Sequence, residues 1–293
     1  MSIKIIPSVL ILLVCWSMHS QEATEIYLFD LIESGEEIVL KNPINISDAE
    51  GYDNQPSFTE DGTGILFSSF RDGQADIVKY FIEENYRVWL TNTPHSEFSP
   101  MPYPNKKKLF TCVRQDTSGV QHVYQYNYKK KPPVPLIDEV MIGYYLWYNP
   151  KSIVSFVIDD VETLMVSNFK YKIRYPIEYS IGRSINKIPA SAGQGVNKIS
   201  YVSMKHETPE IYSIDPLNSK TKYITDALPG SQDMAWTPSG NILMGNGDAL
   251  FSYHPVKGQQ WKRIQIESDL PLDEITRICI SPNGKKIALV VGE

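Results

Sequence analysis

The histidines and serines of this chain do not form a recognised nucleophilic arrangement. Beyond residue 20 the histidines are scattered over four separate segments, as His95, His122, His206 and His254. A nucleophilic serine needs a base beside it, and the Gly-x-Ser-x-Gly turn that exposes such a serine in α/β-hydrolases does not occur. The sequence therefore predicts no catalytic residue.

Metal-binding motifs are also missing. The chain has no His-Glu-x-x-His, no Cys-x-x-Cys and no loop of alternating acids before a glycine. Its densest acidic group is Asp159, Asp160 and Glu162, which we interpret as a polar turn between two strands, with a cation site as the alternative. We predict neither a metal ligand nor a cofactor.

The remaining candidates are polar residues suited to recognition. The predicted partner-binding set is Asp53, Asn54, Arg71, Asp72, Glu97, Arg114, Gln232 and Asp233. Aromatic residues near this set, as at protein-binding rims, are Tyr52, Phe70, Phe98, Tyr144, Tyr145 and Trp147. The planar guanidinium of Arg71 could pair with a partner's carboxylate or with Asp53. Taken singly, the Asp and Asn residues also fit turn caps, and the aromatic residues fit interfaces between sheets.

The elements that would position these residues are short strands. Residues 51–81 contain three strand-like stretches, separated by turns at Asp61-Gly62 and at residues 71–73. Residues 86–91 supply a fourth. Four antiparallel strands in about forty residues cannot bury both faces of their sheet, so the sheet needs neighbours of its own kind.

Those neighbours are visible as an internal repeat. The second strand of each unit begins near Leu66, Leu109, Ile153, Ile199, Ile242 and Ile287, at intervals of 43 to 46 residues. This period is typical of propeller blades. Because successive antiparallel strands reverse direction, the loop before the first strand and the loop between the second and third strands emerge on one face. The predicted partner-binding set belongs to that face.

The last unit lacks its third and fourth strands, which we expect at the other end of the chain. Residues 25–30 (Glu-Ile-Tyr-Leu-Phe-Asp) match residues 210–215 (Glu-Ile-Tyr-Ser-Ile-Asp), and residues 37–40 follow as a fourth strand. The predicted fold is an all-β, six-bladed β-propeller of four-stranded antiparallel blades, closed by N-terminal strands that complete the last blade. Closure removes exposed strand edges.

The best-conforming unit resembles the TolB-type β-propeller repeat. The matching positions are Asn54, Pro56, Phe58, Asp61, Gly62, Ser69, Arg71, Gly73, Asp76 and Ile77, with Thr59-Glu60 in place of Ser-Pro. Residues 281–288 (Ser-Pro-Asn-Gly-Lys-Lys-Ile-Ala) match nearly as well, and the resemblance spans about residues 25–293. TolB itself carries an additional α/β domain before its propeller, for which we expect no room here. The resemblance implies a non-catalytic propeller that binds protein partners in the cell envelope.

The first twenty residues have the layout of a secretory signal peptide. An apolar run at residues 5–16 follows Lys4 and is too short to span a membrane. We predict a signal peptide at residues 1–20 and a single propeller domain at residues 21–293, with a periplasmic or secreted location. A lipid anchor at Cys15 is the alternative.

The net charge narrows the class of partner, and the positions of the cysteines predict whether they form a disulfide. The formal net charge is −6, so we predict no nucleic-acid partner. We interpret the basic runs at residues 106–108 and 129–131 as solvated turns, with an anionic surface as the alternative target. Cys112 and Cys279 fall in strands of different blades, so we expect two free thiols.

The predicted function is that of an exported, monomeric, non-catalytic scaffold that binds a protein or peptide in the cell envelope. Two alternatives from other classes remain. One is a lactonase or lyase with a metal in its channel, because six-bladed enzymes of that kind gather their ligands from several blades. The other is a glycan-binding module that uses Tyr144, Tyr145 or Trp147 as stacking platforms.

Overall fold

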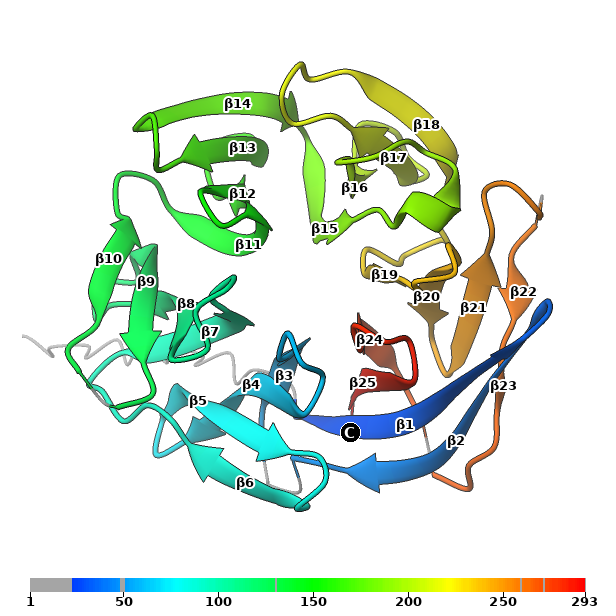
Figure 1. Cartoon of the computed structure of the whole chain (residues 1–293), viewed down its shortest axis with the longest axis horizontal. Helices are drawn as coiled ribbons and strands as arrows, with labels where there is room; N and C mark the ends of the chain where they lie inside the picture. Colours follow the sequence, from blue (N-terminus) through cyan, green and yellow to red (C-terminus); the bar gives the residue numbers. More distant parts are fainter. Residues whose placement is uncertain (1–22, 48–50, 130, 259, 271, 293) are drawn as a thin grey trace, which may run out of the picture.

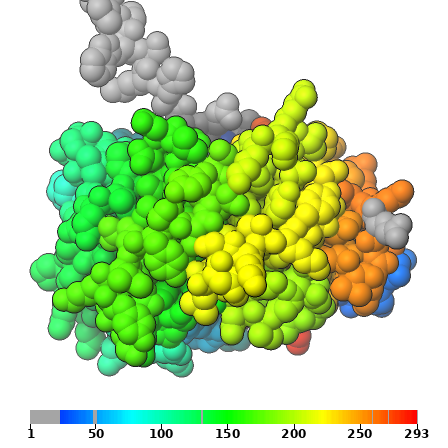
Figure 2. Space-filling view, turned by 90° about the horizontal axis from the view of Figure 1, so that it is seen from above, coloured from blue at the N-terminus to red at the C-terminus, as the bar shows by residue number. Residues whose placement is uncertain are grey.

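The computed structural model describes residues 23–47, 51–129, 131–258, 260–270 and 272–292. Six antiparallel sheets stand around a central axis like the blades of a propeller (Figure 1), which confirms the predicted fold class. Seen edge-on, the ring is wider than it is tall (Figure 2). The predicted signal peptide and Cys15 lie outside the described residues.

Blades 1 to 3 follow the chain order from the axis outwards. Blade 1 contains β3 (Asp53–Phe58), β4 (Gly64–Arg71), β5 (Gln74–Phe81) and β6 (Tyr86–Trp89). Blade 2 contains β7 (Ser96–Pro102), β8 (Leu109–Gln115), β9 (Gln121–Asn127) and β10 (Val134–Ile137). Blade 3 contains β11 (Ile142–Asn149), β12 (Ser152–Val157), β13 (Thr163–Asn168) and β14 (Ile173–Tyr179).

Blades 4 and 5 repeat this order, and blade 6 departs from it. Blade 4 contains β15 (Ile181–Lys187), β16 (Ile199–Ser203), β17 (Glu210–Ile214) and β18 (Thr221–Asp226), with the short helix η1 (Ala190–Ala192) after β15. Blade 5 contains β19 (Met234–Trp236), β20 (Ile242–Asn246), β21 (Ala249–Tyr253) and β22 (Lys262–Arg263). Blade 6 contains β24 (Ile275–Ile280), β25 (Lys286–Gly292), β1 (Thr24–Ser34), β2 (Glu37–Asn45) and β23 (Gln265–Ile266).

The ring closes as the sequence predicts. β1 pairs antiparallel with β25, with Phe29 opposite Ile287, and β2 follows as the fourth strand of blade 6. No sequence pattern predicts β23, a two-residue strand that pairs in parallel with β2 where Val39 lies opposite Gln265. The linker from blade 5 to blade 6 thereby adds a fifth strand outside the closing hairpin.

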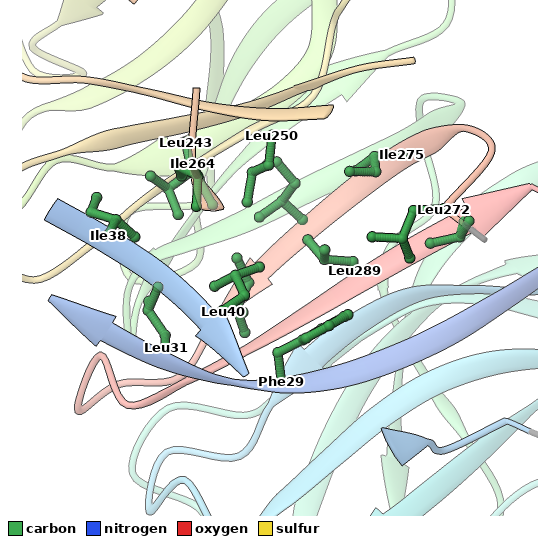
Figure 3. Close-up of a cluster of buried hydrophobic side chains, with 14 residues drawn as sticks. Phe29, Leu31, Ile38, Leu40, Leu243, Leu250, Ile264, Leu272, Ile275 and Leu289 are labelled. Carbon is green, nitrogen blue, oxygen red and sulfur yellow. The ribbon is translucent and has the colours of Figure 1, made fainter. Parts of the chain in front are cut away.

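The core lies between neighbouring blades. The described residues form six clusters of buried apolar side chains, each contributed by two adjacent blades. In β25, Ile287, Leu289 and Val291 pack towards blade 5, whereas Ala288 and Val290 pack towards blade 1. Figure 3 shows the cluster that joins the closing strands β1 and β2 to blade 5. Side chains of a strand alternate between its two faces, so every blade contributes to two clusters and holds both neighbours.

Two further expectations are confirmed. Cys112 lies in β8, Cys279 lies in β24, and both are free thiols. Asp159 and Asp160 lie in the turn between β12 and β13. Within the described part of the chain, no helix is long and apolar enough to cross a membrane.

Candidate binding site in the central channel

The innermost strand of every blade places one side chain at an equivalent position beside the axis. In each blade one residue of this strand pairs with the start of the second strand, as Phe58 does with Ile65 and Ile280 does with Ile287. The residue three positions earlier lines a common cavity of about 140 Å³. We call these six residues the channel ring: Gln55, Ser99, Tyr144, Ser184, Asp233 and Arg277.

Backbone bulges accompany the channel ring in five of the six innermost strands. The pairing register shifts beside Gln55, Ser99, Tyr144, Ser184 and Arg277. Gln55 and Ser99 adopt positive φ values of 58° and 49°, which non-glycine residues rarely do. A bulge redirects side chains relative to the regular alternation of a strand. Strained backbone of this kind clusters at binding sites.

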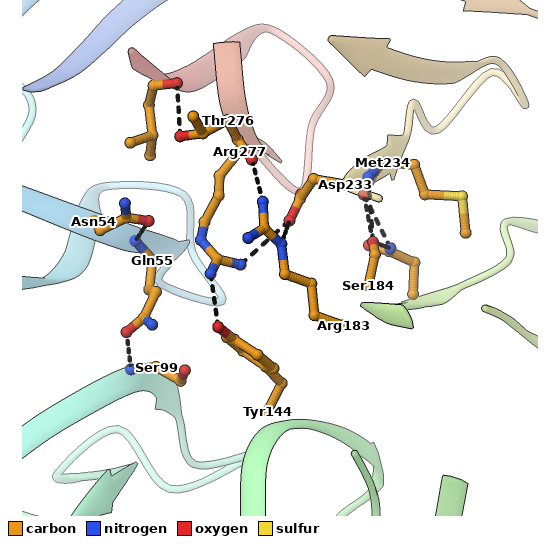
Figure 4. A network of polar contacts seen from close by, with 12 residues as sticks. Asn54, Gln55, Ser99, Tyr144, Arg183, Ser184, Asp233, Met234, Thr276 and Arg277 are labelled. Carbon is orange, nitrogen blue, oxygen red and sulfur yellow. Dashed lines mark hydrogen bonds and ion pairs between the residues drawn. The ribbon is translucent and has the colours of Figure 1, made fainter. Parts of the chain in front are cut away.

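Two arginines and one aspartate form the centre of the site (Figure 4). Asp233 Oδ2 lies 3.2 Å from Nη1 of Arg277 and 3.5 Å from Nε of Arg183. Arg277 also donates from Nη2 to the Tyr144 hydroxyl at 2.8 Å, and its guanidinium lies 4.8 Å from the centre of that ring. Arg183 donates from Nη2 to the carbonyl oxygen of Thr276 at 2.9 Å. Blades 3, 4, 5 and 6 therefore share one polar network.

Burial changes the proton affinity of these groups. It raises the pKa of Asp233, although the two arginines act in the opposite direction. Burial acts to lower the pKa of Arg277, but the neighbouring Tyr144 and Asp233 outweigh it and the pKa is raised. Burial raises the pKa of Tyr52 to about 12, so its phenol is neutral at physiological pH. The centre therefore holds two guanidinium charges against one buried carboxylate.

A wider cavity of about 530 Å³ adjoins this network and shares Tyr144, Arg183 and Arg277 with it. Its lining residues are Thr24, Tyr52, Asn54, Tyr144, Arg183, Gly230, Gln232, Glu274, Thr276 and Arg277. They come from five of the six blades. The cavity opens on the face where the innermost strands begin, which is the face that sequence analysis identified. We call this cavity the channel mouth.

The structure brings three members of the predicted partner-binding set to the channel. Asn54 and Gln232 line the channel mouth, and Asp233 belongs to the channel ring. Asp53 is buried at the start of β3, where its carbonyl oxygen accepts a hydrogen bond from the Thr24 hydroxyl at 2.9 Å. Asp53 thus anchors the entry strand of blade 1 beside the mouth.

Arg71, Asp72 and Arg114 lie elsewhere. Arg71 pairs with Asp76 at 3.3 Å and stacks on Trp89 at 4.0 Å, so the expected pairing with Asp53 is wrong. Asp72 is exposed in the turn between β4 and β5. The guanidinium of Arg114 lies 3.6 Å from the centre of the Tyr124 ring. The two arginines therefore brace the outer parts of blades 1 and 2.

Glu97 is fully buried between blades 1 and 2. Its Oε1 accepts hydrogen bonds from the hydroxyls of Thr93 at 2.6 Å and Tyr126 at 2.9 Å, and its Oε2 has no hydrogen-bond partner among the described residues. Burial raises the pKa of Glu97 to about 7, and the nearby Asp76 adds to this effect. Glu97 therefore acts within the blade interface and does not reach the channel.

The aromatic residues expected to be exposed are also divided between the channel and the buried blade interfaces. Tyr144 lines the channel, but Tyr145 and Trp147 are buried. The Tyr145 hydroxyl and the Trp147 indole nitrogen both donate to the Thr111 hydroxyl, at 2.7 and 3.0 Å. A stacking platform for sugars needs an exposed ring face, so Tyr145 and Trp147 cannot provide one.

Sequence reasoning missed Gln55, Arg183 and Arg277. A signal for the channel ring was present, because Gln55, Ser99, Tyr144, Ser184, Asp233 and Arg277 recur at intervals of 40 to 49 residues. The apolar second strand carries the recognisable repeat, whereas these polar positions change residue type from blade to blade. Arg183 directly precedes Ser184, the channel-ring residue of blade 4. Because the register of β15 shifts between Ile181 and Ile185, the direction of the Arg183 side chain does not follow from regular strand alternation.

Comparisons with known proteins show the fold. A protein assigned as TolB from Agrobacterium tumefaciens has a TM-score of 0.70 at 12% identity, and the match covers 93% of this chain and 99% of that one. TolB from Acinetobacter baumannii has a TM-score of 0.58 at 13% identity over 92% of this chain and 65% of that one. A gluconolactonase from Xanthomonas campestris has a TM-score of 0.63 at 6% identity over 94% and 98% of the two chains.

Neither a protein-family model nor a curated protein sequence matches the chain. At 6% to 13% identity, these structural neighbours share the six-bladed architecture and include both TolB proteins and an enzyme. The same fold carries unrelated functions, so the function has to be argued from the site.

Proposed function

We propose that this protein is an exported, non-catalytic scaffold of the cell envelope that holds a segment of a protein partner at the channel mouth. The observation that carries this proposal is the 530 Å³ cavity with side chains from five blades. Pockets of this size suit a few residues of an extended chain or a small ligand. A rigid ring also lets variable residues at its rim do the recognising.

The polar groups of the channel support binding rather than catalysis. The Ser184 hydroxyl donates to the carbonyl oxygen of Met234 at 3.2 Å, so it is engaged in holding blade 5 against blade 4. None of the described histidines lines the channel ring or the channel mouth. The described residues likewise contain no group of three or more His, Cys, Asp or Glu side chains arranged to hold a metal ion.

Site-specific cross-linking tests the proposal. A photoreactive probe on Gln232→Cys would sit at the channel mouth, and the same probe on Lys107→Cys would sit on the opposite face. Both variants also carry Cys279→Ser, because that thiol is partly exposed, whereas the buried thiol of Cys112 should not compete for the label. After incubation with native envelope extract, we expect a defined adduct from position 232 alone. Equal adducts from both positions, or none from position 232, would refute the proposed binding face.

Export and the enzymatic alternative have their own tests. N-terminal sequencing of the mature protein should find cleavage near Ser20, and an intact Met1 would refute export. A lactonase or lyase would show turnover of a lactone or an oligogalacturonate that is lost on chelation. Turnover of that kind by the purified protein would replace the scaffold proposal.

A further inference from the structure

We infer that the channel mouth recognises a carboxylate group, which the exposed edge of Arg183 binds. This inference rests on the proposed function and names the chemistry of the same site. The mouth and the ring beneath it share Arg183 and Arg277, whose side chains are 33% and 11% exposed. Arg277 is engaged by Asp233 and Tyr144, whereas the more exposed Arg183 has part of its guanidinium in contact with the cavity.

The charges around the cavity favour a singly charged anion. Asp233 lies below the two guanidinium groups and neutralises one of them. Glu274 is an exposed acid on the rim, so part of its field is screened by water. The guanidinium charge that Asp233 does not neutralise lies at the floor of the cavity. A carboxylate that enters the cavity loses the water around it, so its ion pair with the guanidinium becomes stronger than it would be in solvent. A doubly charged phosphate would exceed the available positive charge.

The shape of the donors also favours a carboxylate. Nε of Arg183 faces Asp233, and one N–H of Nη2 goes to the Thr276 carbonyl oxygen, which leaves Nη1 and the second N–H of Nη2. This terminal edge presents two parallel N–H groups, which match the two coplanar oxygens of a carboxylate. Neutral groups complete the lining: the amides of Asn54 and Gln232 and the phenol of Tyr52. They suit the peptide groups or hydroxyls that adjoin such a carboxylate. The carboxylate could belong to an acidic peptide side chain or to a small sugar acid, and the experiment has to separate these sources.

Three probes separate them. The mature chain is titrated calorimetrically with a peptide capped at both ends, Gly-Glu-Gly-Glu-Gly, with its Gln counterpart, and with gluconate. We expect the Glu peptide to bind at least about tenfold more tightly than the Gln peptide, as for hydrogen bonds to a charged group. Binding of gluconate alone would keep the carboxylate inference and would assign the carboxylate to a small sugar acid rather than to a peptide side chain.

Two variants test the residues in opposite directions. Arg183→Gln should weaken binding of the Glu peptide about tenfold or more, whereas Arg263→Gln on exposed β22 should leave it unchanged. Asp233→Asn removes the internal competitor of the incoming carboxylate, so it should tighten binding. A tighter complex cannot result from partial unfolding, which makes this second variant independent of any loss of stability.

The outcomes also distinguish the two proposals. If the adduct from position 232 persists but the Glu and Gln peptides bind alike and Arg183→Gln has no effect, the carboxylate inference fails and the scaffold proposal stands. If no probe binds at millimolar concentration, the carboxylate inference fails as well. Loss of the adduct from position 232 refutes the scaffold proposal, whatever the probes show.

Discussion

Glu97→Gln should remove a pH dependence from the stability of this propeller. Glu97 is fully buried between blades 1 and 2, and burial raises its pKa to about 7 from an ordinary value of 4.5. The folded protein therefore binds this proton more strongly than the unfolded chain does. The contribution to stability is full below pH 4.5 and is lost as pH rises to about 7.

The size of the effect follows from the two pKa values. At about 1.4 kcal/mol for each pH unit, a pKa raised from 4.5 to about 7 corresponds to about 3 kcal/mol, of which about 2.5 kcal/mol falls between pH 5 and pH 8. Both hydrogen bonds from Thr93 and Tyr126 go to Oε1. The carbonyl oxygen of a glutamine can accept both, so the substitution keeps these contacts and removes the titration, while the cost of burying the amide nitrogen at the position of Oε2 is the same at every pH.

Urea unfolding followed by tryptophan fluorescence at pH 5, 6, 7 and 8 measures this difference. We expect the free energy of unfolding of the parent to fall relative to that of Glu97→Gln by about 2.5 kcal/mol across this range. Glu162→Gln changes an exposed glutamate and serves as the matched control, with the pH profile of the parent. The reasoning is refuted if Glu97→Gln keeps the same pH profile as the parent.

Three further predictions concern closure, the outer brace and the thiols. Deleting residues 21–42 removes β1 and exposes the edge of β25, so the product should aggregate in size-exclusion chromatography; a stable monomer would contradict the closure. Arg71→Ala loses the stacking on Trp89 and the pairing with Asp76, so it should lower stability by about 1 kcal/mol in thermal unfolding without changing the adduct from position 232. Cys112 is fully buried, and burial raises the pKa of its thiol well above the ordinary value, so Cys112 should not react with a thiol reagent at pH 8 until the protein unfolds, and rapid reaction of this residue in the native protein would contradict its burial.

The fold was predictable because its signals are local and repeated. Each blade contains a turn such as Asp61-Gly62, where Gly62 takes a φ of 72°, followed by an apolar strand. Six copies at a nearly constant interval identify a propeller even where single copies deviate. β23 could not be foreseen, because two residues at Gln265–Ile266 carry no periodic pattern and pair only after β2 is in place.

The candidate site was only partly predictable, because its membership depends on the direction of side chains. Asn54, Gln232 and Asp233 lie on the face that the strand order predicts, and they line the channel. Glu97 starts an innermost strand in the same way but turns into the blade interface. Which of these outcomes applies depends on the register and local geometry of each innermost strand in the folded sheet, and composition does not reveal either.

The pairing of β1 with β25 has a consequence for the order of folding. Phe29 and Ile287 lie opposite each other although almost the whole described chain separates them. Contacts between such distant residues form late and slowly, because the entropy of closing a long loop opposes them. As the chain emerges during synthesis, β1 precedes its partner by five complete blades. The apolar face that Phe29 and Leu31 bury in the finished ring is then without its cover, so this period is the one in which a holding chaperone would protect the chain from aggregation.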